Sequence, residues 1–277
     1  MTRLGVALGG GGARGLAHLG VLVELLEAGI EPRFAAGTSM GAIVGAAYAV
    51  GQDLSALVRV LTHLDLGELL GLAETFDGLL GRAAVQSLRG RLRRRSWHEE
   101  ECPRRARLAE FLKLFTKGMW FEDLPVPFVA VAADYATGEE VRIDEGPLYH
   151  GVTASAALPG LFTPVPWRKR LLVDGGLVNN LPVDVVAEMG ARTVLAVDVR
   201  APLGPLPQTL VGATLRFLEI SAREVDRLRV ERTRDRLADR LLVIHPDVDA
   251  IGLLEFDRIE DAVAAGRLAA RSALAHL

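Results

Sequence analysis

The pentapeptide Gly37-Thr38-Ser39-Met40-Gly41 places a hydroxyl nucleophile between two glycines. A short apolar run at residues 34–36 precedes it, and an apolar run of helical length at 42–50 follows it. A serine on a sharp turn between strand and helix is typical of a nucleophile elbow, because flanking glycines let the two elements approach closely. An ordinary Gly/Ser turn is the alternative. Ser39 is therefore the candidate nucleophile of an acyl-transfer reaction.

A second glycine-rich stretch, Gly9-Gly10-Gly11-Gly12-Ala13-Arg14-Gly15, connects an apolar run at 4–8 to a segment with helical spacing. Such a loop presents backbone N–H groups at a helix N-terminus, where negative charge is favoured. It fits either a phosphate or dinucleotide cradle or an oxyanion hole that serves Ser39. The loop lacks the Lys-Ser/Thr of a P-loop and matches G-x-G-x-x-G poorly, which favours the oxyanion hole.

A serine nucleophile needs a base, and the usual base is histidine. Of the six histidines, His245 follows the last predicted strand and suits the chain order Ser-Asp-His. The better candidate is Asp174, which ends a short apolar strand and precedes Gly175-Gly176. Residues at the carboxyl ends of strands line the crevice of an open α/β sheet, as Ser39 would. Taken alone, however, Asp-Gly-Gly is more typical of a turn aspartate bonded to its own backbone.

Apolar strand-length runs alternate with helical segments along most of the chain, which predicts an α/β protein with a single domain over residues 1–277. Residues 54–121 form a helical excursion within it. One interpretation is a set of helices with solvated charges. The other is a lid or a membrane-surface patch, with arginines for lipid phosphate and with Trp97, Trp120 and leucines for the acyl region.

Residues 215–237 predict a long helix rich in charged side chains. Leu218, Ala222, Val225 and Leu228 are expected on its inner face. Pairs such as Glu219 and Arg223 are expected to support its outer face, and the remaining charges to be solvated.

Composition excludes several classes of protein. Half of the 277 residues are hydrophobic, the net charge is −3 and the pI is about 6.1, so nothing indicates a nucleic-acid partner. Cys102 is the only cysteine, which fits a reducing compartment, and no His/Cys cluster has metal-ligand spacing. With the first strand close to Met1, no signal peptide is expected. We expect a cytoplasmic protein that contacts membranes only peripherally.

Three segments together resemble the patatin-like phospholipase family, in particular its compact bacterial members. They are the loop Gly10-Gly11-Gly12-Ala13-Arg14-Gly15, the elbow at 37–41 and the turn Asp174-Gly175-Gly176. The segment at 154–165 and Asn180-Leu181-Pro182 are similar as well, whereas the arginine-rich part at 91–117 departs from the family pattern. The resemblance covers nearly the whole chain. It implies a three-layer α/β/α fold with a mainly parallel central sheet.

The resemblance also implies a Ser-Asp dyad without histidine. Ser39 would be the nucleophile, and Asp174 would accept its proton, pass it to the leaving alcohol and then activate water. The amides of Gly10, Gly11 and Gly12 would hold the oxyanion, and that of Met40 could add another donor. Supporting positions carried over with the motifs are Gly15, Gly37, Gly41, Gly175, Gly176 and Arg14. Arg14 would either steady the loop or attract an anionic head group.

The function expected on these grounds is a serine acyl hydrolase that cleaves carboxylic esters of lipids, in the manner of a phospholipase A or lysophospholipase. A lipid or phospholipid ester is its substrate, and no metal or organic cofactor is implied. Two alternatives stay open. One is a Ser-His-Asp carboxylesterase that uses His245. The other is a non-catalytic regulatory protein that binds phosphate or nucleotide through the glycine loop. The sequence makes no prediction of oligomeric state.

Overall fold

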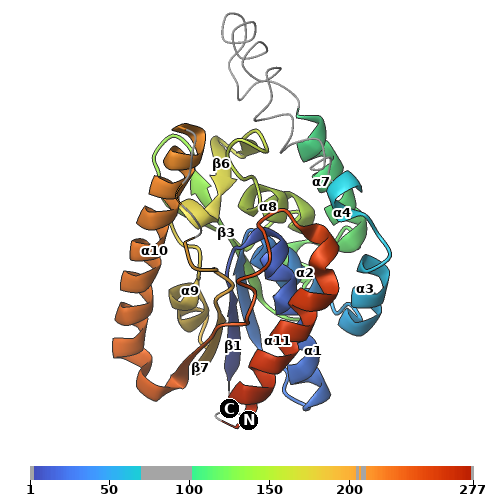
Figure 1. Ribbon diagram of the computed structural model, residues 1–277, viewed down its shortest axis with the longest axis vertical. Helices are drawn as coiled ribbons and strands as arrows, with labels where there is room; N and C mark the ends of the chain where they lie inside the picture. Colours follow the sequence, from blue (N-terminus) through green and yellow to red (C-terminus); the bar gives the residue numbers. More distant parts are fainter. Residues whose placement is uncertain (1–2, 70–101, 204–205, 207–209, 276–277) are drawn as a thin grey trace, which may run out of the picture.

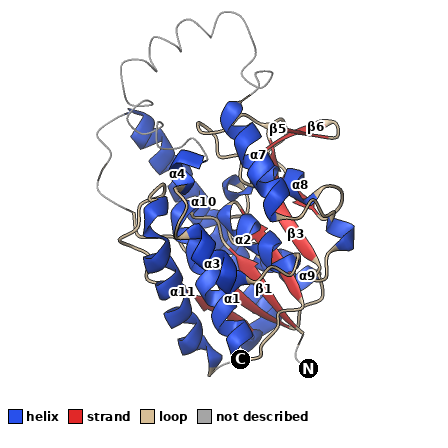
Figure 2. Cartoon of the chain, turned by 90° about the vertical axis from the view of Figure 1, so that its right-hand side faces the viewer, coloured by secondary structure: helices blue, strands red, loops and turns tan. Residues whose placement is uncertain are grey.

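The computed structural model describes residues 3–69, 102–203, 206 and 210–275 of the chain (Figures 1 and 2). Within these residues the strands form one eight-stranded sheet with the order β5-β6-β3-β2-β1-β7-β8, and β4 pairs with β3 off this path. The strands are β1 (Leu4–Leu8), β2 (Phe34–Thr38), β3 (Phe128–Asp134), β4 (Glu140–Ile143), β5 (Val165–Trp167), β6 (Arg170–Asp174), β7 (Thr193–Val197) and β8 (Leu241–Ile244).

The centre of the sheet is parallel. β1 pairs in parallel with β2 and β7, so that Val6 lies between Ala35 and Leu195, and the parallel run extends to β3 and β8. β4 and β6 pair with β3 in the antiparallel direction, and β5 pairs with β6 in the same way. The predicted mainly parallel central sheet is confirmed.

Helices cover both faces of the sheet and make three layers (Figure 1). α1 (Ala17–Glu27), α2 (Met40–Ala49) and α11 (Ile259–Leu274) lie on one face, and α9 (Val183–Glu188) and α10 (Leu210–Leu237) on the other. Side chains alternate across β1 accordingly, because Val6 and Leu8 belong to one hydrophobic core and Ala7 to the other. The prediction of one domain over 1–277 includes residues outside the described ranges and stays a prediction.

The inner face of α10 differs from the one expected. Val225 and Leu228 are 36% and 51% exposed, whereas Asp226 is 1% exposed and Thr233 is buried as well. The face that packs on the protein carries Asp226 and Thr233 together with Val230 and Leu237, which contribute to the second hydrophobic core. Asp226 is buried there because Asn180, Leu181 and Arg200 supply its partners. The expected pair of Glu219 and Arg223 is present at 2.8 Å.

The described part of the helical excursion comprises α3 (Leu54–Leu61), α4 (Leu66–Leu69) and α7 (Pro103–Phe115). After α7 the chain returns to the sheet at β3, and α7 packs against α8 (Leu148–Ser155). Trp97 and residues 91–101 of the arginine-rich stretch lie outside the described residues. Arg105 is half-buried and donates hydrogen bonds to Thr163 Oγ1 at 2.9 Å and to the Pro164 carbonyl at 2.5 Å, so that one arginine of this stretch is bound within the protein. Among the described helices, none has the length and apolar character of a membrane span.

Candidate active site

Ser39 occupies a strained turn between β2 and α2. Its backbone has φ 55° and ψ −121°, a conformation that side-chain-bearing residues rarely adopt and that marks a nucleophile elbow. The flanking glycines are required by close approach. A Cβ on Gly41 would collide with the Leu8 carbonyl at the end of β1, and one on Gly37 would collide with the Gly41 carbonyl. The predicted elbow is therefore the point where β2, α2 and the end of β1 meet.

Asp174 reaches Ser39 from the end of a strand that runs antiparallel to the centre of the sheet. Because β6 runs antiparallel to β3, Asp174 lies beside Ala132 in the middle of that strand, next to the position where Val131 pairs with Thr38. Ser39 Oγ donates a hydrogen bond of 2.7 Å to Asp174 Oδ2. The Gly176 N–H donates to the other oxygen, Oδ1, at 2.8 Å. Gly175 makes this possible, since a Cβ there would collide with the Val131 carbonyl.

The surroundings of Asp174 make it a stronger base than an ordinary aspartate. The side chain is 3% exposed, and burial raises the pKa of its carboxyl from 3.8 to about 6. The hydrogen bonds from Ser39 and Gly176 act in the opposite direction, because they stabilise the ionised form. A carboxylate with this pKa is mostly ionised at neutral pH and still binds a proton about a hundredfold more tightly than a solvated one, which suits general-base catalysis.

The glycine loop lies beside Ser39, but its amides are not equally available. The Gly10 N–H is donated to the Asn180 carbonyl at 3.1 Å, so that this predicted oxyanion donor is already occupied. Gly10 is also buried, whereas Gly11 and Gly12 are partly exposed. Within the described residues, the backbone N–H groups of Gly11, Gly12 and Met40 have no backbone acceptor. The prediction that these amides bind an oxyanion stays a prediction.

Neighbouring side chains hold the loop in place. Arg14 Nε donates to the Ile251 carbonyl at 2.6 Å, and the Ala13 N–H donates to the Leu253 carbonyl at 2.9 Å. On the inner side, His18 Nε2 donates to the Gly9 carbonyl at 2.7 Å, and burial lowers the pKa of His18 to about 4, which keeps it neutral. Gly15 packs against the side chain of Met40. Of the two roles considered for Arg14, this contact corresponds to steadying the loop.

Three residues at the site were missed by the sequence analysis as functional positions. Ser155 Oγ accepts a hydrogen bond from the Ser39 N–H at 3.1 Å and donates to the Val131 carbonyl at 2.5 Å. Thr38 Oγ1 donates to the Asn179 carbonyl at 2.8 Å, and Asn180 Nδ2 to the Gly10 carbonyl at 3.1 Å. The available signal was weak: Ser155 and Asn180 stand in segments noted only for their overall similarity to a family pattern.

His245 is engaged elsewhere. Its Nδ1 lies 3.6 Å from Asp198 Oδ2, its side chain is 65% exposed, and Ser39 Oγ donates to Asp174 instead of to a histidine. His245 and Asp198 line a small surface pocket of about 380 Å³ together with Arg200 and Arg223.

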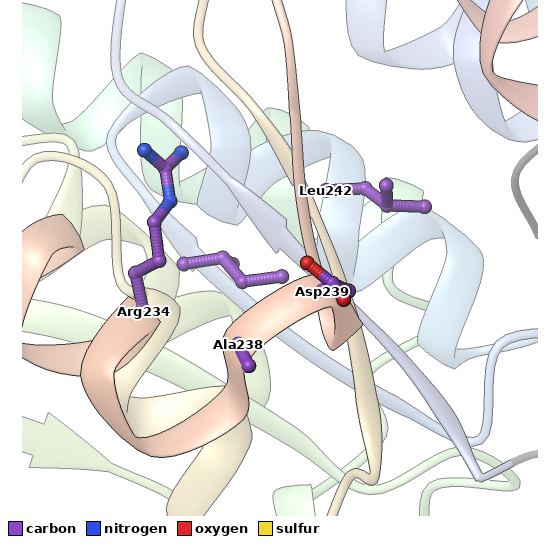
Figure 3. Close-up of a pocket in the computed structure, with 5 residues that line it drawn as sticks. Arg234, Ala238, Asp239 and Leu242 are labelled. Carbon is purple, nitrogen blue, oxygen red and sulfur yellow. The ribbon is translucent and has the colours of Figure 1, made fainter.

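A larger pocket, shown in Figure 3, lies where α10 ends and β8 begins. It is lined by Arg234, Ala238, Asp239, Leu241 and Leu242 and contains none of the predicted site residues. The part of the chain that the structure describes contains no group of three or more His, Cys, Asp or Glu side chains arranged to hold a metal ion.

The fold and the elbow define an α/β protein with a serine on a strand-to-helix turn and an aspartate in hydrogen-bond contact with it. A family model described as "Patatin-like phospholipase" matches residues 6–187, a range that includes the glycine loop, Ser39 and Asp174. The chain belongs to the patatin-like phospholipase family.

The chain is similar in sequence to proteins of both bacteria and animals. An uncharacterized NTE family protein of Mycobacterium tuberculosis is 34% identical over 98% of this chain and 46% of its own length. The patatin-like phospholipase domain-containing protein 6 of Mus musculus is 34% identical over 71% of this chain and 13% of its own length. The chain thus spans about half the length, or less, of these curated relatives.

The crystal structure of VipD from Legionella pneumophila resembles this fold with a TM-score of 0.50 at 15% identity, and the match covers 99% of this chain and 66% of VipD. At this identity the likeness concerns the fold. Together with the family match, it confirms the predicted three-layer patatin-like architecture.

Proposed function

We propose that this protein is a serine acyl hydrolase that cleaves carboxylic ester bonds of lipids, with phospholipase A or lysophospholipase activity, through a dyad of Ser39 and Asp174. The observation that carries the proposal is the 2.7 Å hydrogen bond from Ser39 Oγ to Asp174 Oδ2 on a strained elbow. Membership of the patatin-like phospholipase family supports the lipid ester as substrate class.

The reaction would proceed in two halves. Asp174 accepts the hydroxyl proton while Ser39 Oγ attacks the ester carbonyl carbon, and the tetrahedral oxyanion forms near the amides of Gly11, Gly12 and Met40. Asp174 then gives the proton to the departing alkoxide, which leaves as an alcohol and leaves an acyl group on Ser39. In the second half Asp174 takes a proton from water, the hydroxide attacks the acyl carbon, and the fatty acid departs as Ser39 regains its proton.

The rim of the site suits an apolar substrate. Leu177, three residues after Asp174, is 37% exposed, and Leu253, which packs on Gly12, is 42% exposed. The predicted peripheral membrane contact stays a prediction. Exposed apolar side chains in the described part of the excursion, such as Leu114 and Trp120, support it.

Labelling with a fluorophosphonate probe tests the nucleophile. We expect the probe to label the wild-type protein and Ser272→Ala, which removes an exposed hydroxyl on α11, and not to label Ser39→Ala. We expect wild type to release fatty acid from phosphatidylcholine or lysophosphatidylcholine, and Ser39→Ala to release none. Equal labelling of wild type and Ser39→Ala would overturn the proposal. Stabilisation of an unlabelled wild type by nucleotide would favour the regulatory alternative.

A further inference from the structure

Asn180 connects the glycine loop to the turn that carries Asp174. Its carbonyl accepts the Gly10 N–H at 3.1 Å, and its side-chain Nδ2 donates to the Gly10 carbonyl at 3.1 Å. Both backbone polar groups of Gly10 are thus bound by one residue. The contact is tight, because a Cβ on Gly10 would collide with Asn180 Oδ1 and would lie 3.1 Å from Ser39 Cβ. Whatever moves Asn180 therefore moves the loop beside the nucleophile.

The residue before it extends the same connection to the rest of the site. The Asn179 N–H donates to the Gly175 carbonyl at 2.9 Å, which closes the turn after Asp174. The Asn179 carbonyl in turn accepts the hydroxyl of Thr38 at 2.8 Å, in the residue that precedes Ser39. Asn179 and Asn180 together contact the three parts on which the proposed chemistry depends: the base, the elbow and the glycine loop.

This segment is held from behind by a carboxylate on α10. Asp226 Oδ1 accepts the N–H of Asn180 at 2.9 Å and that of Leu181 at 3.4 Å. Asp226 Oδ2 pairs with Arg200 at 2.9 Å, and Arg200 also pairs with Asp198 at 2.6 Å. Asp226 is 1% exposed, so that in its absence the two amides would lose a buried acceptor that water does not readily replace.

We propose that Asp226 is a positioning residue of the acyl hydrolase site, which fixes the backbone of Asn180 and through it the distance between the glycine loop and Ser39. The inference rests on the proposed function. It assigns part of the site to a helix outside the stretch that the family model matches, which ends at residue 187. Burial raises the pKa of Asp226 to about 6, and the guanidinium of Arg200 opposes that rise, which agrees with a carboxylate held inside by specific partners.

The test compares Asp226→Ala with Asp226→Asn. Alanine removes the acceptor for the Asn180 N–H, whereas asparagine keeps an oxygen at that position. Glu224→Gln is the matched control, because Glu224 lies on the same helix and its ion pair with Arg227 is exposed on the surface. The readouts are kcat and KM for a short-chain nitrophenyl ester, the rate of fluorophosphonate labelling, and amide hydrogen exchange of peptides that cover residues 8–16 and 176–184.

For Asp226→Ala we expect kcat and the labelling rate to fall about ten- to hundredfold with KM little changed, since a small misplacement of the loop is enough for such a loss. Hydrogen exchange should accelerate in the two named peptides and not elsewhere. Asp226→Asn should stay within about threefold of wild type, and Glu224→Gln should match wild type in every readout.

Wild-type kcat and wild-type protection of residues 8–16 in a folded Asp226→Ala protein would overturn the inference. An equal loss of kcat in Asp226→Ala and Asp226→Asn would also overturn the inference, because the loss would then not come from removing the oxygen that accepts the Asn180 N–H. If Asp226→Ala does not fold, Asp226→Ser decides: its shorter side chain cannot accept both the Asn180 and the Leu181 N–H, so wild-type exchange at residues 8–16 and a wild-type kcat would overturn the inference. If wild type does not react with the probe at Ser39, the proposed function is contradicted. The hydrogen-exchange data would still test whether Asp226 holds the backbone of Asn180 in place.

Discussion

The turn at the end of β6 and the middle of α10 each bury one carboxylate, and burial raises the pKa of both to about 6. Their partners differ. Asp174 faces the hydroxyl of Ser39 and one backbone amide, and no ion pair to it is present among the described residues. Asp226 faces the guanidinium of Arg200 and two backbone amides. An equal shift of pKa thus arises in two different environments.

This difference in partners explains why Asp174 is suited to proton transfer and Asp226 to holding the backbone in place. A hydroxyl gives up its proton during acyl transfer, whereas a backbone amide and a guanidinium keep theirs at any pH at which the protein is folded. Asp174 can therefore act as a base toward Ser39, and Asp226 can only hold its partners in place. The identity of the hydrogen-bond donor, more than the pKa itself, separates the two roles.

The comparison first predicts how hydrolysis depends on pH. The base must be ionised, so kcat/KM should be constant above a midpoint near pH 6 and fall about tenfold for each pH unit below it, or about a hundredfold at pH 4. The measurement is kcat/KM for a nitrophenyl ester between pH 4 and 8, with folding checked at each pH by circular dichroism.

Two variants assign that midpoint. Asp226 has a similar pKa and His245 is the alternative base, so the profile is repeated with Asp226→Asn and with His245→Ala. We expect both variants to keep a midpoint near pH 6. If the midpoint near pH 6 disappears in either variant, the substituted residue and not Asp174 would be the group whose ionisation controls hydrolysis.

A smaller effect is expected on stability. The pKa of Asp174 is higher in the folded state than its ordinary value of 3.8, so the folded protein binds more protons than the unfolded chain between about pH 4 and 6. Stability therefore falls as pH rises through this window, and above pH 6 the buried charge opposes folding by up to about 3 kcal/mol. Asparagine carries no charge, so Asp174→Asn should raise the free energy of unfolding at pH 8 by about 1–3 kcal/mol.

Thermal or urea denaturation at two pH values measures this effect. The advantage of Asp174→Asn over wild type should shrink toward pH 4, where the aspartate is protonated in both states. If Asp174→Asn is equally or less stable than wild type at pH 8, the charge of Asp174 is compensated in the folded protein. Asp174 would then not differ from Asp226, whose charge is compensated by Arg200.

The elements that sequence could predict are those with local signals. The elbow around Ser39 and the glycine loop after β1 each combine a strand, a run of glycines and a helix, and the alternation of strands and helices predicted the α/β fold. The motifs also brought Ser39 and Asp174 to attention as a pair, although they did not predict that the strand before Asp174 runs antiparallel to β3. The antiparallel pairing of β6 with β3 depends on contacts between segments that lie forty residues apart in the chain.

The contacts that sequence could not predict are long-range and polar. Asp226 stands in a helix rich in charged side chains, and the sequence does not show that this one is buried against Asn180 and Arg200. Asn180 likewise resembles an ordinary turn residue in the sequence. Only the structure shows that its side chain binds Gly10, which lies 170 positions earlier in the chain. The oxyanion assignment shifted for the same reason, since the N–H of Gly10 is used by Asn180 and not left for substrate.

The central claim is that Asp174, and not a histidine, is the base for Ser39. It is tested most directly by kcat/KM for a short-chain nitrophenyl ester in Asp174→Asn and His245→Ala beside wild type, at pH 8. We predict that Asp174→Asn loses at least about a thousandfold, as expected when a general base is removed, while His245→Ala stays within about twofold of wild type. Substantial hydrolysis by Asp174→Asn, or its loss in His245→Ala, would contradict the dyad.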